Sequence, residues 1–366
     1  YNNSQTLNLT NTYMARAGYP ALTSSKYSAT VANPVPGSQR DCPNAAGEQD
    51  LDVQSTHAVA PKASIAYYGA GSCYDGDLTR QLQLMVDQHK VSTISMSFGS
   101  DTDAGMSTAT KAAWDRPLRQ AALTGISAFA STGDAGDNSF FSQSKRTSVS
   151  SPASNAYLTA VGGTTVGMRA NGSFATVTGW ESRIFRQYSS TAPGWADITT
   201  REAARNGADI SGGGGGLSST WAQPTWQKGI IKSSPTRRAL PDISALADPS
   251  TGFITRSNEP GYGTSYQVVG GTSLASPIIA ALVGVAKANN KVSIGNVAPK
   301  LYAMRAGITD VNSPARSGSF IIDAKTNQSI VIGNDAKPQS LVSGKGWDSA
   351  TGLGTPNGAA FRAELK

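Results

Sequence analysis

Residues 91–131 read VSTISMSFGSDTDAGMSTATKAAWDRPLRQAALTGISAFAS, and their pattern decides the fold class. Two apolar runs, 91–98 and 126–131, have the length and bounds of buried strands, and they enclose a helical pattern over 106–123. The preceding stretch repeats this rhythm, with an apolar run over 63–68 and a helical pattern over 78–89. Strands that alternate with helices predict an α/β fold with a mostly parallel central sheet flanked by helices.

Two short loops follow the strands of this stretch. Parallel strands present functional residues on the loops at their carboxyl ends. The segments SFGS at 97–100 and STGDAGD at 131–137 fall at such ends. Both are therefore candidate site loops.

Length and composition narrow the class of protein. The chain has 366 residues, 39% of them hydrophobic, so it can bury a substantial core, and we expect one domain over residues 1–366. Only 15% of residues are charged and the net charge of +7 is scattered, which argues against a nucleic-acid partner. We see no apolar run of the ~18 residues that a membrane span needs. The opening YNNS has no basic-then-apolar segment, so we expect any signal peptide to have been removed.

The two cysteines, Cys42 and Cys73, bracket a predicted acidic helix and the strand after it. Two thiols are too few for a structural zinc site. One disulfide could join them, which would indicate an oxidising compartment, or they could be two free, partly buried thiols.

The middle of the chain, about 166–260, is irregular in pattern and contains five consecutive glycines at 212–216. Such a run is either a flexible linker or a turn packed within the domain. Trp221 and Trp226 follow closely, and this favours the packed turn.

Ser273 is a candidate nucleophile. It lies in GGTSLASPIIAALVGVA, which starts at Gly270 and predicts a glycine turn that opens a long apolar helix. There the helix amino end would face a developing negative charge. A serine at this position is also an ordinary helix cap, and the pattern alone does not choose between the two.

A serine nucleophile needs a base, and the two histidines are poor candidates. His89 ends an amphipathic helix, where it complements the helix dipole. His57 lacks the His-Gly-x-His run and the upstream Asp-x-Gly strand of subtilisin-like proteases. A neutral hydrolase that uses His57 stays a rival hypothesis.

Carboxylates offer a better base. Glu48 and Asp52 stand four apart on a predicted helix and project from one face, so their charges repel and one pKa should rise. The alternative is a solvated acidic first turn. Asp134, in its glycine-flanked loop, could be a metal ligand, a turn residue or an acid.

Taken together, these segments resemble the sedolisin, or serine-carboxyl peptidase, family. The resemblance rests on Glu48-x-x-x-Asp52, STGDAG at 131–136 and GTSLASP at 271–277, in the family's order. Supporting segments extend it over nearly the whole chain: SPAS at 151–154, VGGTT at 161–165, the glycine run before Leu217 and PDISA at 241–245.

The resemblance implies a three-layer subtilisin-like fold and a separate catalytic role for each of four residues. Ser273 would be the nucleophile, Glu48 the general base that takes its proton, and Asp52 the group that orients Glu48. Asp134 would be the oxyanion-hole acid, which donates a hydrogen bond only while it is protonated, so activity in acid is implied. By analogy with other oxyanion donors, its loss should lower turnover roughly 10²- to 10³-fold.

The resemblance also implies a calcium site within about 305–355. Its ligands would be two carboxylates and three backbone carbonyls, a hard oxygen set that suits Ca²⁺, from Asp310, Val311, Gly344, Gly346 and Asp348. The alternative is two loop aspartates flanked by glycine. The stretch between Asp310 and Gly344 looks longer than in most relatives.

Further expectations come from the family. Its members have a strand just before the segment resembling YNNS, preceded by a large propeptide, whereas this chain opens on a helical pattern over 7–17. The strand was removed by processing, stays as a noncovalent N-terminal fragment, or lies outside the given chain. We expect a secreted, extracellular, monomeric endopeptidase acting on peptides or unfolded proteins, its substrate extended along 97–100 and 212–216. A tripeptidyl-peptidase and a catalytically silent binding scaffold are the alternatives.

Overall fold

The computed structural model describes residues 3–38, 42, 45–139, 146–186, 210–232, 236–259, 263–312, 318–323, 328–333 and 340–366. Its helices are α1 (Thr6–Arg16), α2 (Ala46–Val59), α3 (Asp75–Gln88), α4 (Thr108–Thr124), α6 (Thr272–Asn290), α7 (Ala298–Leu301) and α8 (Gly358–Glu364). The strands of the first half are β1 (Tyr27–Val31), β2 (Ile65–Gly69), β3 (Thr93–Met96), β4 (Ser127–Ser131), β5 (Thr159–Met168), β6 (Phe174–Gly179) and β7 (Glu181–Arg186). Those of the second half are β8 (Ile210–Gly212), β9 (Gly216–Ala222), β10 (Arg237–Leu240), β11 (Ile243–Leu246), β12 (Phe253–Glu259), β13 (Gly263–Val269), β14 (Ile308–Thr309), β15 (Gly318–Asp323), β16 (Gln328–Gly333) and β17 (Thr355–Pro356).

The centre of the fold is a parallel sheet in the order β11-β5-β4-β3, with β6 added antiparallel to β5. The ladders β3–β4, β4–β5 and β5–β11 are all parallel. Strands β1 and β2 form a separate parallel pair, in which Tyr27 lies opposite Ile65. Within the described residues, β3 pairs with β4 alone, so the parallel strands fall into two groups.

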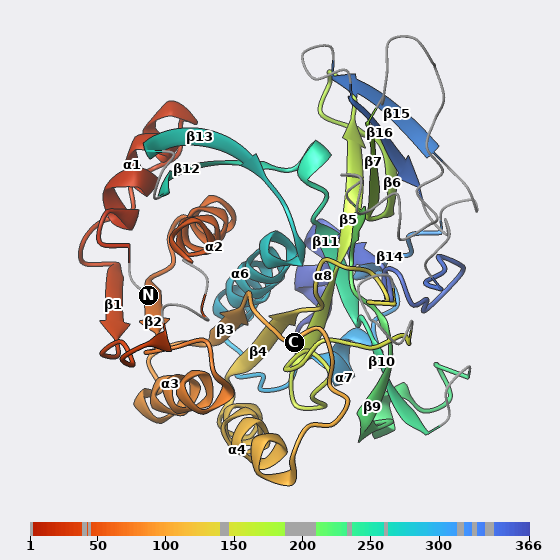
Figure 1. The fold of residues 1–366 in the computed structure, drawn as a ribbon, viewed down its shortest axis with the longest axis horizontal. Coiled ribbons are helices and arrows are strands. Elements are labelled where there is room, and N and C mark those ends of the chain that lie inside the picture. The colour runs from red at the N-terminus through yellow and green to blue at the C-terminus, as the bar shows by residue number, and fades with distance from the viewer. Residues whose placement is uncertain are drawn as a thin grey trace.

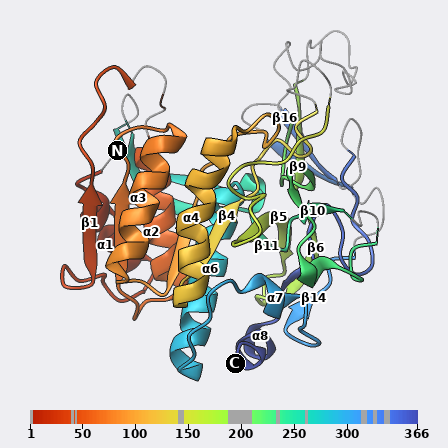
Figure 2. The ribbon, with the colours of Figure 1, turned by 90° about the horizontal axis from the view of Figure 1, so that it is seen from below.

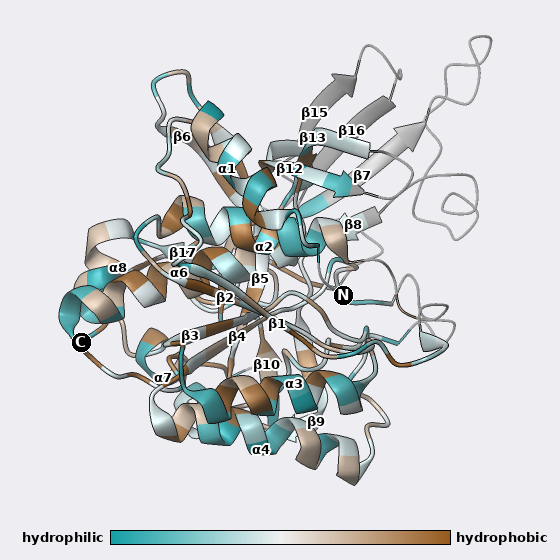
Figure 3. Cartoon of the chain, turned by 90° about the vertical axis from the view of Figure 1, so that its left-hand side faces the viewer, coloured by the Kyte–Doolittle hydropathy of each residue, from teal (hydrophilic) through white to brown (hydrophobic). Residues whose placement is uncertain are grey.

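Helices cover both faces of this sheet, which confirms the predicted α/β class. Figure 1 shows α2 and α6 on one side of β3 and β4, with α3 and α4 on the other side. Figure 2 shows α3 and α4 lying side by side. Strand β4 is buried on both faces: Ala128 and Ala130 belong to the core shared with α3 and α4, and Phe129 to the core shared with α6. In Figure 3, α3 and α4 carry both hydrophilic and hydrophobic residues, as amphipathic covering helices do.

Helix α6 is the central core helix of the fold. By length and composition alone it is apolar enough to cross a membrane, but 61% of its apolar window is buried inside the protein. It packs against α2 and against strands β3, β4, β5 and β11. Its hydrophobicity is therefore explained by burial in the core.

The expectation of an irregular middle is wrong, because residues 174–259 contain several strands. They form antiparallel pairs, β9 with β10 and β12 with β13, and β7 and β8 join β15 and β16 in one sheet. Segments such as FATVTG at 174–179 mix polar and apolar residues, as strands with one solvated face do, so an apolar-run criterion misses them. The hairpin β15–β16 also accounts for much of the long stretch between Asp310 and Gly344.

The two cysteines form a disulfide, Cys42–Cys73, with 5.4 Å between their Cα atoms. It joins the loop before α2 to the loop after β2. The alternative of two free thiols is therefore wrong.

Candidate active site

The amino end of α6 presents Ser273 as the second residue of the helix. The N-cap is Gly271, at φ 90°, so Ser273 is not the cap. A side chain at Gly271 would place its Cβ 2.6 Å from Asp134 Oδ2, and only glycine fits there. Because the first amides of a helix have no intrahelical acceptor, the Ser273 N–H is a ready donor.

Helix α2 carries Glu48 and Asp52 toward Ser273. The pKa of Glu48 is raised to about 7, and burial is the largest cause. The hydrogen bond with the Ser273 hydroxyl opposes this rise, and the charge of Asp134 adds to it. The pKa of Asp52 is raised well above its ordinary value, first by burial and then by the Glu48 charge. Glu48 Oε1 is buried and has no hydrogen-bond partner within the described residues. The alternative of a solvated acidic turn does not hold for this pair.

Asp134 reaches the same place from the loop after β4. Its Oδ1 accepts hydrogen bonds from the Thr272 N–H at 2.8 Å and the Thr272 hydroxyl at 2.9 Å. Burial raises the pKa of Asp134 above its ordinary value, and the two bonds from Thr272 oppose that rise. Since both bonds end on Oδ1, Oδ2 is the oxygen left to carry an acid proton.

The glycine run holds the Asp134 loop by backbone contacts. Gly212 N–H donates to Asp134 O at 2.8 Å, Gly136 N–H to Gly212 O at 3.0 Å, and Gly214 N–H to Gly133 O at 2.8 Å. Residues 212–215 are buried, so the run is a packed turn and the linker alternative is wrong.

Ser97, directly after β3, joins the site through a contact that the sequence did not predict. Its hydroxyl donates to Asp52 Oδ1 at 2.6 Å, and the Ser273 hydroxyl lies 3.5 Å from the Ser97 carbonyl. The one feature of the sequence that pointed to Ser97 was that residues 97–100 follow a predicted parallel strand. The structure thus brings Ser273, Glu48, Asp52 and Asp134 together, with Ser97 as a fifth member.

Both histidines lie apart from Ser273 in their contacts. His57 is fully buried, and its Nε2 lies 2.8 Å from the Pro20 carbonyl. His89 caps α3 at its C-terminal end in a left-handed conformation, φ 48°. The position of His57 disfavours a histidine-based hydrolase.

The residues predicted to bind calcium lie on two segments, Asp310 and Val311 after β14, and the loop over 344–348. Gly346 N–H donates to Asp310 Oδ2 at 2.7 Å, and Gly344 N–H donates to Asp348 Oδ2 at 2.9 Å. Burial, opposed by several backbone N–H donors, raises the pKa of Asp348 to about 6. No group of three or more His, Cys, Asp or Glu side chains that could hold a metal occurs in the described part of the chain, so carbonyls would have to complete the ligand set. Two carboxylates that converge on one glycine loop fit a hard cation.

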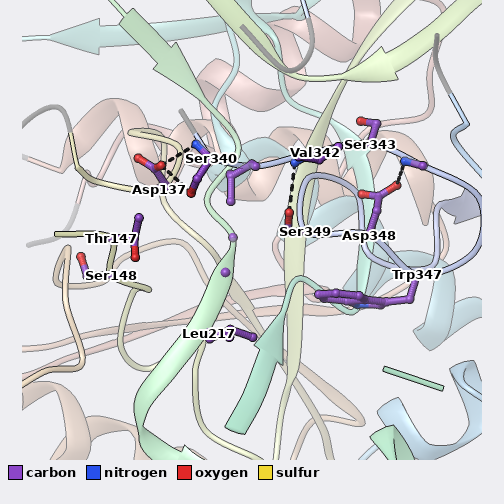
Figure 4. Close-up of a pocket in the computed structure, with 14 residues that line it drawn as sticks. Asp137, Thr147, Ser148, Leu217, Ser340, Val342, Ser343, Trp347, Asp348 and Ser349 are labelled. Atoms are coloured by element: carbon purple, nitrogen blue, oxygen red, sulfur yellow. Dashed lines mark hydrogen bonds between the residues drawn. The ribbon is translucent and has the colours of Figure 1, made fainter. Parts of the chain in front are cut away.

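A cavity of about 450 Å³ lies between this loop and the end of the Asp134 loop (Figure 4). Its lining includes Leu217, Val342 and Trp347, and at one side the buried Asp137 accepts hydrogen bonds from the Ser340 N–H and hydroxyl. None of Ser273, Glu48, Asp52 or Asp134 lines it. The cavity is therefore separate from the cluster around Ser273.

Known proteins resemble this chain over most of its length. The model of the subtilase family matches residues 42–298. Kumamolisin of Bacillus sp. (strain MN-32) is 30% identical over 325 residues, 85% of this chain and 49% of its own length. Tripeptidyl-peptidase 1 of Homo sapiens is 25% identical over 342 residues, 87% of this chain and 51% of its own length. The chain thus spans about half the length of the curated relatives it matches.

A solved structure extends the match to the fold. Pseudomonas sedolisin (serine-carboxyl proteinase), complexed with two molecules of pseudo-iodotyrostatin, superposes with a TM-score of 0.74 and 26% identity. The superposition covers 99% of this chain and 89% of the sedolisin chain. This likeness confirms the predicted subtilisin-like fold. The chain belongs to the subtilase family and, within it, to the sedolisins.

Proposed function

We propose that this protein is a serine-carboxyl endopeptidase that cleaves peptide bonds through an acyl-enzyme on Ser273. The observation that carries the proposal is the meeting of a helix-terminal serine with three carboxyl groups whose pKa values are all raised by loss of contact with water. Buried titratable groups with shifted pKa values, gathered beside a nucleophile, are typical of catalytic sites. A binding protein without catalytic activity would gain nothing from this arrangement, because removing carboxylates from water costs folding free energy.

The reaction follows from the positions of the groups. Ser273 Oγ attacks the peptide carbonyl carbon while its proton passes to Glu48, which Asp52 orients. Asp134, protonated on Oδ2, and the Ser273 N–H donate to the oxyanion. Glu48 then gives the proton to the leaving amine, which leaves an ester on Ser273. Glu48 then takes a proton from water, which attacks this ester, and returns the proton to Ser273 Oγ as the ester C–O bond breaks and the acid product leaves.

The active form needs Glu48 ionised and Asp134 protonated, so we expect activity on the acid side of neutrality. The population of this form peaks midway between the two pKa values; that of Glu48 is about 7, and that of Asp134 is raised from 3.8 by burial. As pH rises further, Asp134 loses its proton and the oxyanion donor is lost. An Asp134→Asn variant can keep Oδ1 toward Thr272 and donate from Nδ2 at any pH. We expect its kcat/KM for a denatured protein, measured from about pH 2 to 8, to lose the fall at high pH.

The wild-type enzyme measured in parallel is the reference for this profile. An alkaline fall that stays unchanged in Asp134→Asn would exclude Asp134 as its cause. Wild-type activity that peaks at or above neutrality would contradict acid action.

Substrate would lie extended along residues 98–100, where Phe98 is 38% exposed next to Ser97. The likeness to a tripeptidyl-peptidase makes exopeptidase action the second candidate. Peptides with blocked amino termini distinguish the two, because an endopeptidase cleaves them and a tripeptidyl-peptidase does not.

We also propose that Asp310, Val311 and the loop over 344–348 bind Ca²⁺ through the carboxylates of Asp310 and Asp348 and the carbonyls of Val311, Gly344 and Gly346. Removal of calcium with EGTA should lower the Tm by a few degrees, because a ligand at 100 times its Kd stabilises the folded state by about 2.7 kcal/mol. In Asp348→Asn the Tm should be low and independent of calcium. The matched control is Asp87→Asn, which changes an exposed aspartate of α3. A wild-type Tm that does not respond to calcium contradicts the site.

The setting of the protein is part of the proposal. The Cys42–Cys73 disulfide supports secretion into an oxidising, extracellular compartment. By analogy with the family, we infer a propeptide, monomeric action on peptides or unfolded proteins, and an N-terminal strand that pairs with the parallel sheet, held covalently or as a noncovalent fragment.

A further inference from the structure

Ser97 contacts both halves of the candidate active site. It follows β3 directly and is 8% exposed. Its hydroxyl lies 2.6 Å from Asp52 Oδ1 and 3.1 Å from the Ser273 carbonyl, and its own carbonyl lies 3.5 Å from Ser273 Oγ. One residue therefore connects the carboxyl pair on α2 with the nucleophile on α6.

The Ser97 hydroxyl has one proton to donate, and geometry decides where it goes. The bond to Asp52 is shorter and ends on a carboxylate, and both features make it the stronger of the two. Among the described residues, the Ser97 hydroxyl is the donor that reaches the Asp52 side chain. Oδ1 is thereby an acceptor, which leaves the other oxygen of Asp52 to hold a proton shared with Glu48.

We propose that Ser97 is a positioning residue of the reaction, whose hydroxyl fixes Asp52 and, through Asp52, the base Glu48. The inference rests on the proposed function. A freely rotating Asp52 could turn its proton away from Glu48 or offer it to Ser273. With Oδ1 held by Ser97, the proton stays between the two carboxyl groups and Glu48 keeps its other oxygen for the nucleophile.

Other charged groups near α2 have partners of their own. The Asp50 carboxylate accepts from Thr6 and Asn3, on the α1 side of the helix. Arg256 of β12 stacks on Tyr266, as does Arg16 of α1. On α6, Lys287 donates to the carbonyls of Ser92 and Ile294, away from the Ser273 end. The pKa of Asp52 is thus raised first by burial and then by the Glu48 charge, and the Ser97 hydroxyl lowers it.

The test is Ser97→Ala. We expect kcat to fall roughly 10- to 100-fold, the range for a lost hydrogen bond to a charged group, with KM unchanged because the Ser97 backbone remains. Loss of a donor to the ionised form raises the pKa of the pair, so the acid limb of the kcat profile should move to higher pH. Ser97→Thr keeps the hydroxyl and should restore both readouts.

The matched control is Ser95→Ala, on the same strand. The Ser95 hydroxyl lies 2.9 Å from the Ser276 hydroxyl and does not touch Asp52, so this change removes a β3–α6 hydrogen bond of similar length. Ser95→Ala should leave the acid limb of the kcat profile at the same pH as in the wild type. If Ser97→Ala fails to fold, Ser97→Cys replaces it, since a thiol is a weaker donor and should give a smaller shift of the same sign.

An infrared titration of the protonated-carboxyl band separates this inference from the proposed function. If the wild type hydrolyses no peptide, the proposed function fails, while an upward shift of the titration in Ser97→Ala still supports the action of Ser97 on Asp52. If the wild type is active but Ser97→Ala behaves like Ser95→Ala in both titrations, the positioning role is overturned. A lower kcat without a shift also overturns it, because a merely structural role would give that result.

Discussion

Ser273→Ala is expected to lower kcat for peptide hydrolysis roughly 10⁵- to 10⁶-fold, the loss typical of a deleted serine nucleophile. The reason is that, among the described residues, Ser273 is the one that lies between the Glu48 carboxyl and the helix amides. Substrate binding should survive, so KM should change little. Single-turnover assays with a fluorogenic peptide, together with trapping of the wild type by a serine-directed aldehyde, measure the effect.

Ser276→Ala is the matched control for the nucleophile. Ser276 lies one turn further along α6 and is fully buried against Ser95. Its loss should lower stability and leave kcat within a few-fold of the wild type. Equal activity in Ser273→Ala and the wild type would exclude the acyl-enzyme.

Glu48→Gln is expected to lower kcat about 10³- to 10⁴-fold, the upper range for loss of a general base. The amide has the shape of the carboxyl group but cannot accept the Ser273 proton. The remaining carboxyl, Asp52, is held by Ser97 and is poorly placed to replace it. The variant should also lose the acid limb that Glu48 produces, which pH profiles of kcat/KM would show.

His57→Ala tests the rival base in the same experiment. Because His57 Nε2 faces the Pro20 carbonyl, this variant should keep its activity once corrected for the folded fraction. An inactive His57→Ala beside an active Glu48→Gln would establish a histidine-based hydrolase and refute the role of Glu48.

The sequence predicted the elements whose residues are buried on both faces. Strand β4 and helix α6 are almost wholly apolar or small, so their patterns are unambiguous. The strands between 174 and 259 were not predicted because their solvated faces carry polar residues, and local pattern does not distinguish such a strand from a loop. Local periodicity is thus most informative where burial is complete.

For the candidate site, the sequence proposed the residues and the structure supplied their contacts. The four residues came from motifs, whereas the Thr272 bonds to Asp134 and the Ser97 bond to Asp52 join residues 138 and 45 positions apart. No spacing rule reaches that far along the chain. The glycine run shows the same limit, because its packing depends on partners around Gly133 and Gly163 that only the folded chain brings together.

The packing of Gly213, Gly214 and Gly215 also marks where this scaffold resists redesign. A Cβ atom on these residues would come within 2.9 Å of Gly163 N, 1.9 Å of Thr132 O and 1.9 Å of Ser349 O, respectively. Even alanine would therefore push main chain against main chain, and the cost would fall on the loop of Asp134 and on the segment next to Asp348 at once. Leu217, 46% exposed at the rim of the cavity, has no such restriction. Variants that aim to reshape this cavity should therefore change Leu217 and keep the three glycines fixed.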